Sequence, residues 1–157
     1  MKNYLSLKKV CILFFIFSFS FLISFAHLPI DNKLIPSNVK ENFAKKFPAA
    51  GAVVWIQPYP GFFETSFSIE KHLLWVWFSE AGDWISTDTK LMREEFPVNA
   101  SAYLDSNTSP GIISSYNKSE SSINVSYYAE GNEGENSFIY WFDIDGNFTR
   151  KEELFDR

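Results

Sequence analysis

Apolar and polar residues alternate along much of the chain, and the clearest alternation falls in two short aromatic runs. Residues 73–78 read Leu-Leu-Trp-Val-Trp-Phe, and residues 137–142 read Ser-Phe-Ile-Tyr-Trp-Phe. Aromatic and branched residues of this kind are typical of β-strands, in which successive side chains point to opposite faces. Two sets of side chains are therefore predicted to face the core: Leu74, Val76 and Phe78 in the first run, and Phe138, Tyr140 and Phe142 in the second.

Each run leads into a turn of the same pattern. Residues 77–84 and 141–148 both read Trp-Phe-x-x-x-Gly, then Asp or Asn, then an aromatic residue. A second short extended run follows each glycine, and strand, glycine turn and strand together indicate a β-hairpin. Gly82 and Gly146 are expected there because one turn residue must take a positive φ. The matching turns suggest that the chain contains two copies of one unit.

The second turn also has some features of a calcium-binding loop. Asp143, Asp145 and Gly146 are spaced as in such a loop, but Trp141 occupies a position where a ligand would be required. The first copy has no acidic residue at the positions that match the two aspartates. A turn therefore explains both copies, and we predict no metal site and no cofactor.

The remaining pattern extends each copy to one helix and four strands. Pro36 begins a segment in which Val39, Phe43 and Phe47 share one helical face, and Pro48 ends it. A second, shorter helix is expected after Pro97, ending before residue 106. The predicted strands cover residues 52–57, 62–69, 73–78 and 83–87, and then 112–116, 123–128, 137–142 and 148–152. The fold class is therefore α+β, with two tandem helix-plus-four-strand units over residues 36–90 and 91–157.

The first 26 residues have the pattern of a secretory signal peptide. Lysines lie at the start, an apolar run covers residues 10–25, and Ser24 and Ala26 provide small residues before a cut at His27. The alternative is a retained anchor helix, for which the run is short. Residues 27–35 are expected to form a flexible leader. We therefore expect the protein to be periplasmic or extracellular, and not to associate with a membrane after cleavage.

Cleavage changes both the charge and the thiol content. The chain has 14 basic and 19 acidic residues, net −5, and removing three lysines leaves 11 against 19, net −8. Cys11, the single cysteine, is lost as well, so the mature chain has no disulfide or thiolate. An acidic chain without a basic cluster is a poor ligand for phosphate backbones, and we predict no nucleic-acid partner.

Candidate catalytic residues are few. His27 lies at the new terminus and His72 in a tight turn, and no serine or aspartate motif accompanies either. No pattern brings two carboxylates together, and there is no glycine-rich phosphate loop. We therefore expect no enzyme activity.

The side of the two aromatic runs that faces away from the predicted core is the candidate partner-binding surface. Three tryptophans at about 150–250 Å² each amount to roughly 450–750 Å², as much as the largest apolar patch of a typical monomer. Such a face would need a protein, saccharide or second copy as partner, unless loops or the other unit cover it. The candidate residues are Trp75, Trp77, Ile139 and Trp141.

Taken together, these motifs resemble those of bacterial PepSY-like and β-lactamase-inhibitor-like (BLIP-like) secreted domains. They are the signal segment, Pro-x-x-Val-x-x-x-Phe-x-x-x-Phe-Pro over residues 36–48, Trp55, Phe67, the first turn motif and Trp-Phe-Asp-x-Asp-Gly in the second. The resemblance covers the whole mature chain. The sequence departs from the family pattern in the second unit, where the helical pattern is weak and Ser137 replaces an apolar residue.

The resemblance implies helices packed on one face of the antiparallel sheet and an open aromatic face that grips a target enzyme. It further implies a non-catalytic module that inhibits or restrains an envelope or secreted hydrolase or peptidase, with a protein partner whose identity the sequence does not specify. The alternative is a protein of the cell envelope that binds or senses a small apolar ligand between the two units.

Overall fold

The structure is a computed structural model that describes residues 28–154. The predicted signal peptide, residues 1–26, lies outside the described residues. The described part contains two α-helices, two short 3-10 helices and eight strands. In chain order they are η1 (Asn32–Leu34), α1 (Ser37–Lys46), β1 (Val54–Tyr59), β2 (Phe62–Ile69), β3 (His72–Ser79), β4 (Trp84–Leu91), η2 (Arg93–Glu95), α2 (Val98–Asn107), β5 (Ile113–Ser121), β6 (Val125–Glu133), β7 (Asn136–Phe142) and β8 (Phe148–Leu154).

All eight strands belong to one antiparallel sheet, in the order β1 to β8. β4 and β5 join its two halves by pairing from Ser86 and Ser121 to Leu91 and Tyr116. The prediction of two tandem units, each with its own four-stranded sheet, is therefore wrong. Two separate sheets would each expose an additional edge of unpaired backbone groups, and the β4–β5 pairing removes both of those edges.

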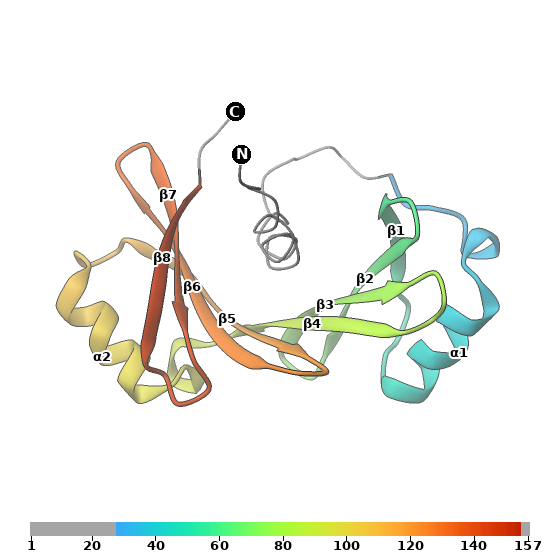
Figure 1. Cartoon of the computed structure of the whole chain (residues 1–157), viewed down its shortest axis with the longest axis horizontal. Helices are drawn as coiled ribbons and strands as arrows, with labels where there is room; N and C mark the ends of the chain where they lie inside the picture. Colours follow the sequence, from blue (N-terminus) through green and yellow to red (C-terminus); the bar gives the residue numbers. More distant parts are fainter. Residues whose placement is uncertain (1–27, 155–157) are drawn as a thin grey trace, which may run out of the picture.

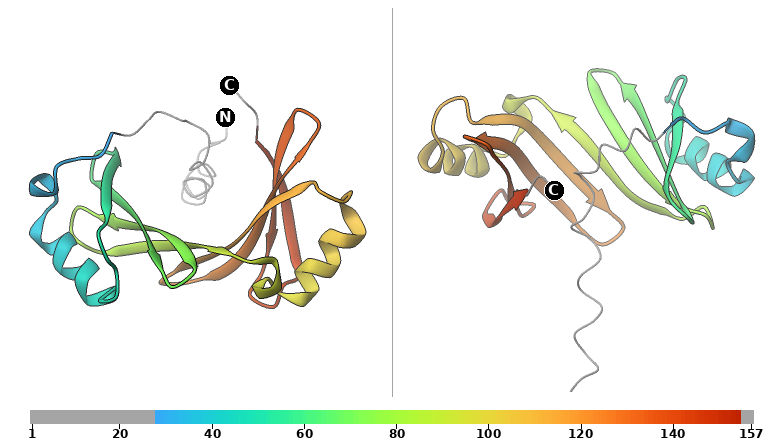
Figure 2. Two further views of the ribbon diagram at one scale, coloured as in Figure 1. Left: turned by 180° about the vertical axis from the view of Figure 1, so that it is seen from behind. Right: turned by 90° about the horizontal axis from the view of Figure 1, so that it is seen from above.

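The sheet is strongly curved, and the two helices lie at opposite ends of the molecule (Figures 1 and 2). Each helix packs on the outer side of its own half of the single sheet, so the predicted arrangement of one helix on each of two separate four-stranded sheets is wrong. The opposite side of the sheet lies on the inside of the curve, and we call it the concave face. Its residues come from alternate positions of neighbouring strands.

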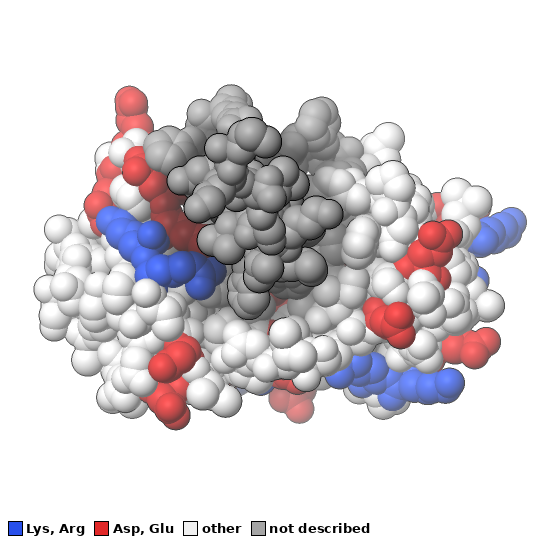
Figure 3. Space-filling view, viewed as in Figure 1, with Lys and Arg blue, Asp and Glu red and all other residues white. Residues whose placement is uncertain are grey.

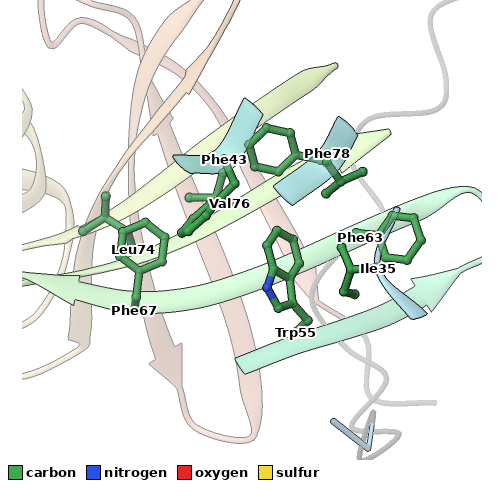
Figure 4. Packing of buried hydrophobic residues seen from close by; sticks show 9 residues of the cluster. Ile35, Phe43, Trp55, Phe63, Phe67, Leu74, Val76 and Phe78 are labelled. Carbon is green, nitrogen blue, oxygen red and sulfur yellow. The ribbon is translucent and has the colours of Figure 1, made fainter. Parts of the chain in front are cut away.

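The first core lies between α1 and strands β1 to β3 (Figure 4). Val39 and Phe43 point from α1 into it, as the helical periodicity predicts. The Phe43 ring lies 5.2 Å from that of Phe67 and 5.3 Å from that of Trp55, both edge-on. The predicted core positions of β3 are confirmed, since Val76 and Phe78 are 0% exposed and Leu74 is also buried.

The second core lies between α2 and strands β6 and β7. Tyr140 and Phe142 are buried there with Leu104, and Phe138 packs against them. α2 continues to Asn107 instead of ending before residue 106. Three polar side chains stabilise this longer helix by donating hydrogen bonds to backbone carbonyls four residues earlier. These are the side chains of Ser106, Asn107 and Thr108.

The two glycine turns have matching geometry. Gly82 has φ +85° and Gly146 has φ +80°. In the first turn the Ser79 amide donates to the carbonyl of Asp83 at 2.9 Å, and in the second Asp143 donates to Asn147 at 2.9 Å. Each turn is also tied to its helix by an asparagine amide: Asn42 Nδ2 donates to the Gly82 carbonyl, and Asn99 Nδ2 donates to the Asp145 carbonyl.

The segment before α1, treated above as a flexible leader, contributes to the first core. Ile35 is 2% exposed and belongs to that cluster. The Ile30 amide donates to the Trp55 carbonyl at 2.9 Å, and residues 32–34 form η1. The difference arises because Ile30 and Ile35 supply apolar surface that covers the end of the sheet.

Candidate functional site

The four predicted surface residues lie on the concave face, at two separated places. Trp75 and Trp77 are on β3, whereas Ile139 and Trp141 are on β7, with three strands between them. Strand pairing fixes what lies beside Trp75 and Trp77. Trp75 pairs with Asp88, and Trp77 pairs with Glu64 and Ser86. The candidate surface is therefore not one continuous aromatic patch.

The β3 end of the concave face remains partly open. Trp75 and Trp77 are each half-buried. The ring of Tyr59, an exposed residue of β1, lies roughly parallel to that of Trp77, with the two centroids 6.5 Å apart. Neither tryptophan belongs to the first core, which takes the alternate residues of the same strand. This end presents indole surface beside polar groups.

The β7 end is filled by the chain's own side chains. Ile139 is 7% exposed. The Trp141 ring packs on Tyr128 at 4.8 Å, the Arg150 guanidinium lies 4.6 Å from its centroid, and its indole N–H donates to Glu152 at 3.0 Å. Ile139 and Trp141 are thus held by contacts within the chain.

Between the two ends lies a polar centre that the sequence analysis did not identify. It contains Asp88 from β4 and Tyr128 and Glu130 from β6. Burial raises the pKa of Asp88; a hydrogen bond from Ser119 opposes this rise, and the nearby charge of Glu130 adds to it. Burial also raises the pKa of Tyr128, and the charges of Asp88 and Glu130 act in the same direction.

Glu130 is anchored in this centre by a chain of hydrogen bonds. The Ser115 hydroxyl donates to its carboxylate at 2.7 Å, and the buried Asn117 amide donates to Ser115 at 2.9 Å. Asp88 lies just beyond the strand predicted for residues 83–87. If the predicted strand 83–87 had been extended by one residue and paired with residues 73–78, Asp88 would have been placed beside Trp75 on the concave face.

His72 and Asp143, two titratable groups considered from the sequence, form structural contacts. His72 Nε2 lies 2.9 Å from both Glu95 carboxylate oxygens, linking β3 to η2. The Asp143 carboxylate accepts hydrogen bonds from the Asn147 side-chain amide and from the backbone amides of Asn147 and Asp145, and these bonds hold its pKa low. Within residues 28–154, no three His, Cys, Asp or Glu side chains are grouped so that they could hold a metal ion.

One hollow, with a volume of about 280 Å³, lies at the end of α2. Arg93 and Asp105 line it and form a paired contact at 2.6 Å, so its wall is charged and does not favour an apolar ligand. Among the described helices, none has the length and apolar character needed to cross a membrane. On the face shown in Figure 3, lysine and arginine side chains lie in small separate groups.

Protein-family models give no match for this chain, and curated proteins give none. Solved structures do match its fold. A protein described as a candidate periplasmic protein from Bacteroides eggerthii DSM 20697 has a TM-score of 0.68 at 18% identity, over 75% of this chain and 88% of its own. A DUF2874 family protein from Bacteroides ovatus ATCC 8483 has a TM-score of 0.68 at 19% identity, over 75% of this chain and 86% of its own.

A BLIP-like protein from Bacteroides fragilis NCTC 9343 has a TM-score of 0.68 at 14% identity, over 78% of this chain and 88% of its own. The expected BLIP-like resemblance is therefore confirmed at the level of the fold. The expected periplasmic or extracellular location agrees with the description of the Bacteroides eggerthii protein.

Proposed function

We propose that this chain is a non-catalytic binding module of the periplasm or extracellular space, and that it binds a protein through the β3 end of its concave face. Trp75 and Trp77 are the anchors of that surface. Their position supports the proposal most strongly, because these two half-buried indoles lie on a sheet face that neither helix covers. Tryptophan is enriched at the points of a protein interface that contribute most binding energy.

The proposed surface is narrower than the four residues chosen from the sequence. Ile139 is buried, and Trp141 is engaged by Tyr128, Arg150 and Glu152. We assign these two residues to support of the β7 end. They shape the concave face without acting as contact anchors.

We further propose that binding inhibits or restrains a secreted or envelope hydrolase. One structural neighbour is described as BLIP-like, and this likeness of fold supports the idea. The concave face suits such a role because a curved sheet can enclose a protruding loop. Within the described residues, His72, Glu95 and Asp143 all serve structural contacts, which supports a role without catalysis.

An internal duplication and a cleaved signal segment complete the proposal. The matching φ angles and hydrogen bonds of the Gly82 and Gly146 turns support duplication of one helix-plus-four-strand segment whose copies then joined into one sheet. The basic start and apolar run of residues 1–26 support secretion.

Capture of partners from envelope and culture extracts tests the proposed function. The bait is the purified protein, compared with the Trp75→Ala plus Trp77→Ala variant. A control variant, Ile123→Ala plus Ile144→Ala, removes two apolar side chains that are 93% and 61% exposed in the β5–β6 and β7–β8 turns. We expect a hydrolase to be retained by the protein and the control, and to be lost from the tryptophan variant. Equal retention by all three baits would contradict the proposal.

A further inference from the structure

The β7 end of the concave face contains a complete cation site made by the chain itself. The Arg150 guanidinium lies 4.6 Å from the centroid of Trp141, and its Nε donates to Glu152 at 2.7 Å. An indole face, a carboxylate and a guanidinium thus occur together. Arginine suits this arrangement because its planar group stacks on a ring and pairs with a carboxylate at the same time.

The β3 end has the indole and the carboxylate without the cation. Trp75 and Asp88 are register partners on neighbouring strands, so their side chains stand next to each other on the concave face. Of the contacts between cations and rings within residues 28–154, none involves Trp75. Lys90 follows Asp88 on the same side of β4, and the described ion pairs do not include it.

Tyr128 borders the same centre from β6. Its side chain is only 9% exposed, but within residues 28–154 no fully buried side-chain polar atom lacks a hydrogen-bond partner. The Tyr128 hydroxyl appears in none of the hydrogen bonds found among these residues, so it is open to solvent at the concave face. The charges of Asp88 and Glu130 both act on it, which places the hydroxyl near these two carboxylates. A group bound at this centre can therefore form a hydrogen bond with the phenol oxygen.

The spacing of the three side chains suits a guanidinium group. Asp88 pairs with Ser119 and Tyr128 pairs with Asn117 on the strand between them, so the Asp88 and Tyr128 backbones are offset by two residues and lie roughly 12 Å apart. Both side chains stand on the concave face, and Trp75 borders Asp88 on β3. A planar cation held there could stack on the indole, pair with the Asp88 carboxylate and contact the phenol oxygen.

We propose that Trp75, Asp88 and Tyr128 form a recognition site for the guanidinium group of an arginine side chain on the protein partner. This inference rests on the proposed function and specifies the chemistry that its surface selects. The net charge of −8 after loss of the first 26 residues acts in the same direction, because it draws positively charged partners towards the face. Arg150 on Trp141 shows the same contact made within the chain.

The test uses N-acetyl-arginine methylamide as probe and the protein purified from cells expressing the full chain. Binding is followed by NMR at the indole N–H of Trp75, assigned with a Trp75→Phe variant. N-acetyl-citrulline methylamide is the matched neutral probe. We expect the Trp75 signal to shift with arginine amide in the millimolar range, and the citrulline compound to bind at least tenfold more weakly.

Two variants locate the site. Asp88→Asn keeps the size of the side chain and should weaken arginine-amide binding about tenfold, since one charged contact is lost. Glu94→Gln removes an exposed charge from η2 and should leave binding unchanged. Spectra of both variants must retain the dispersion of the folded protein, and Tyr128→Phe provides a third variant that removes only the hydroxyl.

The outcomes separate this inference from the proposed function. Equal binding of citrulline and arginine compounds, or unchanged binding by Asp88→Asn, would overturn the arginine site. If arginine amide binds as expected while the capture experiment yields no Trp75-dependent protein, the site stands and the proposed function fails. If the capture succeeds and the probe does not bind, the proposed function stands and this inference fails.

Discussion

Gly146 lies against Pro97 so closely that a Cβ atom added to the glycine would come within 2.7 Å of the proline Cβ. Its φ of +80° also disfavours any residue with a side chain. We expect Gly146→Ala to lower the free energy of unfolding by roughly 2–5 kcal/mol, because a left-handed backbone costs about 1–2 kcal/mol and overpacking a further 1–3. Denaturant unfolding of the two proteins measures this loss.

Gly111 offers the matched control. Its φ is +84°, but an added Cβ would meet no atom within 4 Å. Gly111→Ala should therefore cost only the backbone contribution of about 1–2 kcal/mol. Equal losses in the two variants would show that the contact between the second turn and α2 contributes nothing.

The single sheet predicts that both halves unfold together. Phe78 is 0% exposed in the first core, and Phe78→Ala should cost about 3–5 kcal/mol. Because β4 and β5 pair along six residue pairs, we expect hydrogen exchange to speed up by the same factor in the most protected amides of β3 and of β7. Faster exchange confined to residues before β5 would mean that the two halves unfold independently.

Some strands of the sheet were evident from the sequence, whereas others were not. The strands beside the glycine turns follow from alternation alone, because Val76, Phe78, Tyr140 and Phe142 each fall on the apolar side. α1 follows equally well from the spacing of Val39 and Phe43. These elements combine strong local propensity with a buried face, so local pattern and tertiary packing agree.

The join between the halves could not be predicted in the same way. β5 reads Ile-Ser-Ser-Tyr-Asn-Lys-Ser-Glu-Ser, and serine, asparagine and lysine do not favour a strand by themselves. It forms a strand because β4 and β6 satisfy its backbone on both sides. The predicted strand covered only residues 112–116, because the second half of β5 is polar. Polar side chains such as Asn117 and Ser119 also make the concave centre polar, and Asp88, Tyr128 and Glu130 were missed with them.

Asp88 is expected to destabilise the fold at neutral pH. Burial raises its folded pKa, so its ionised form is favoured more in the unfolded chain. Asp88→Asn should therefore raise the free energy of unfolding at pH 7. The gain should shrink as the pH falls through the raised folded value, and it should vanish below the unfolded value of about 3.9.

The other charged groups that face Asp88 do not reverse this sign. Glu130 and Tyr128 approach it from β6, and Lys90 follows it on β4. Glu130 raises the pKa further, and the Ser119 hydrogen bond is the one opposing contribution among those acting on Asp88. Urea unfolding at a series of pH values, with Glu94→Gln as a control, measures the difference. A stability loss in Asp88→Asn at pH 7 would show that the carboxylate is already paired in the free protein.

Site-specific photo-crosslinking in living cells tests whether the concave face binds a protein. A photoreactive phenylalanine analogue is placed at position 77 on the concave face, and in a second strain at position 45, an exposed site on α1. We predict a discrete crosslinked protein adduct from position 77 and none from position 45. Adducts of the same protein from both positions, or from position 45 alone, would contradict binding through the concave face.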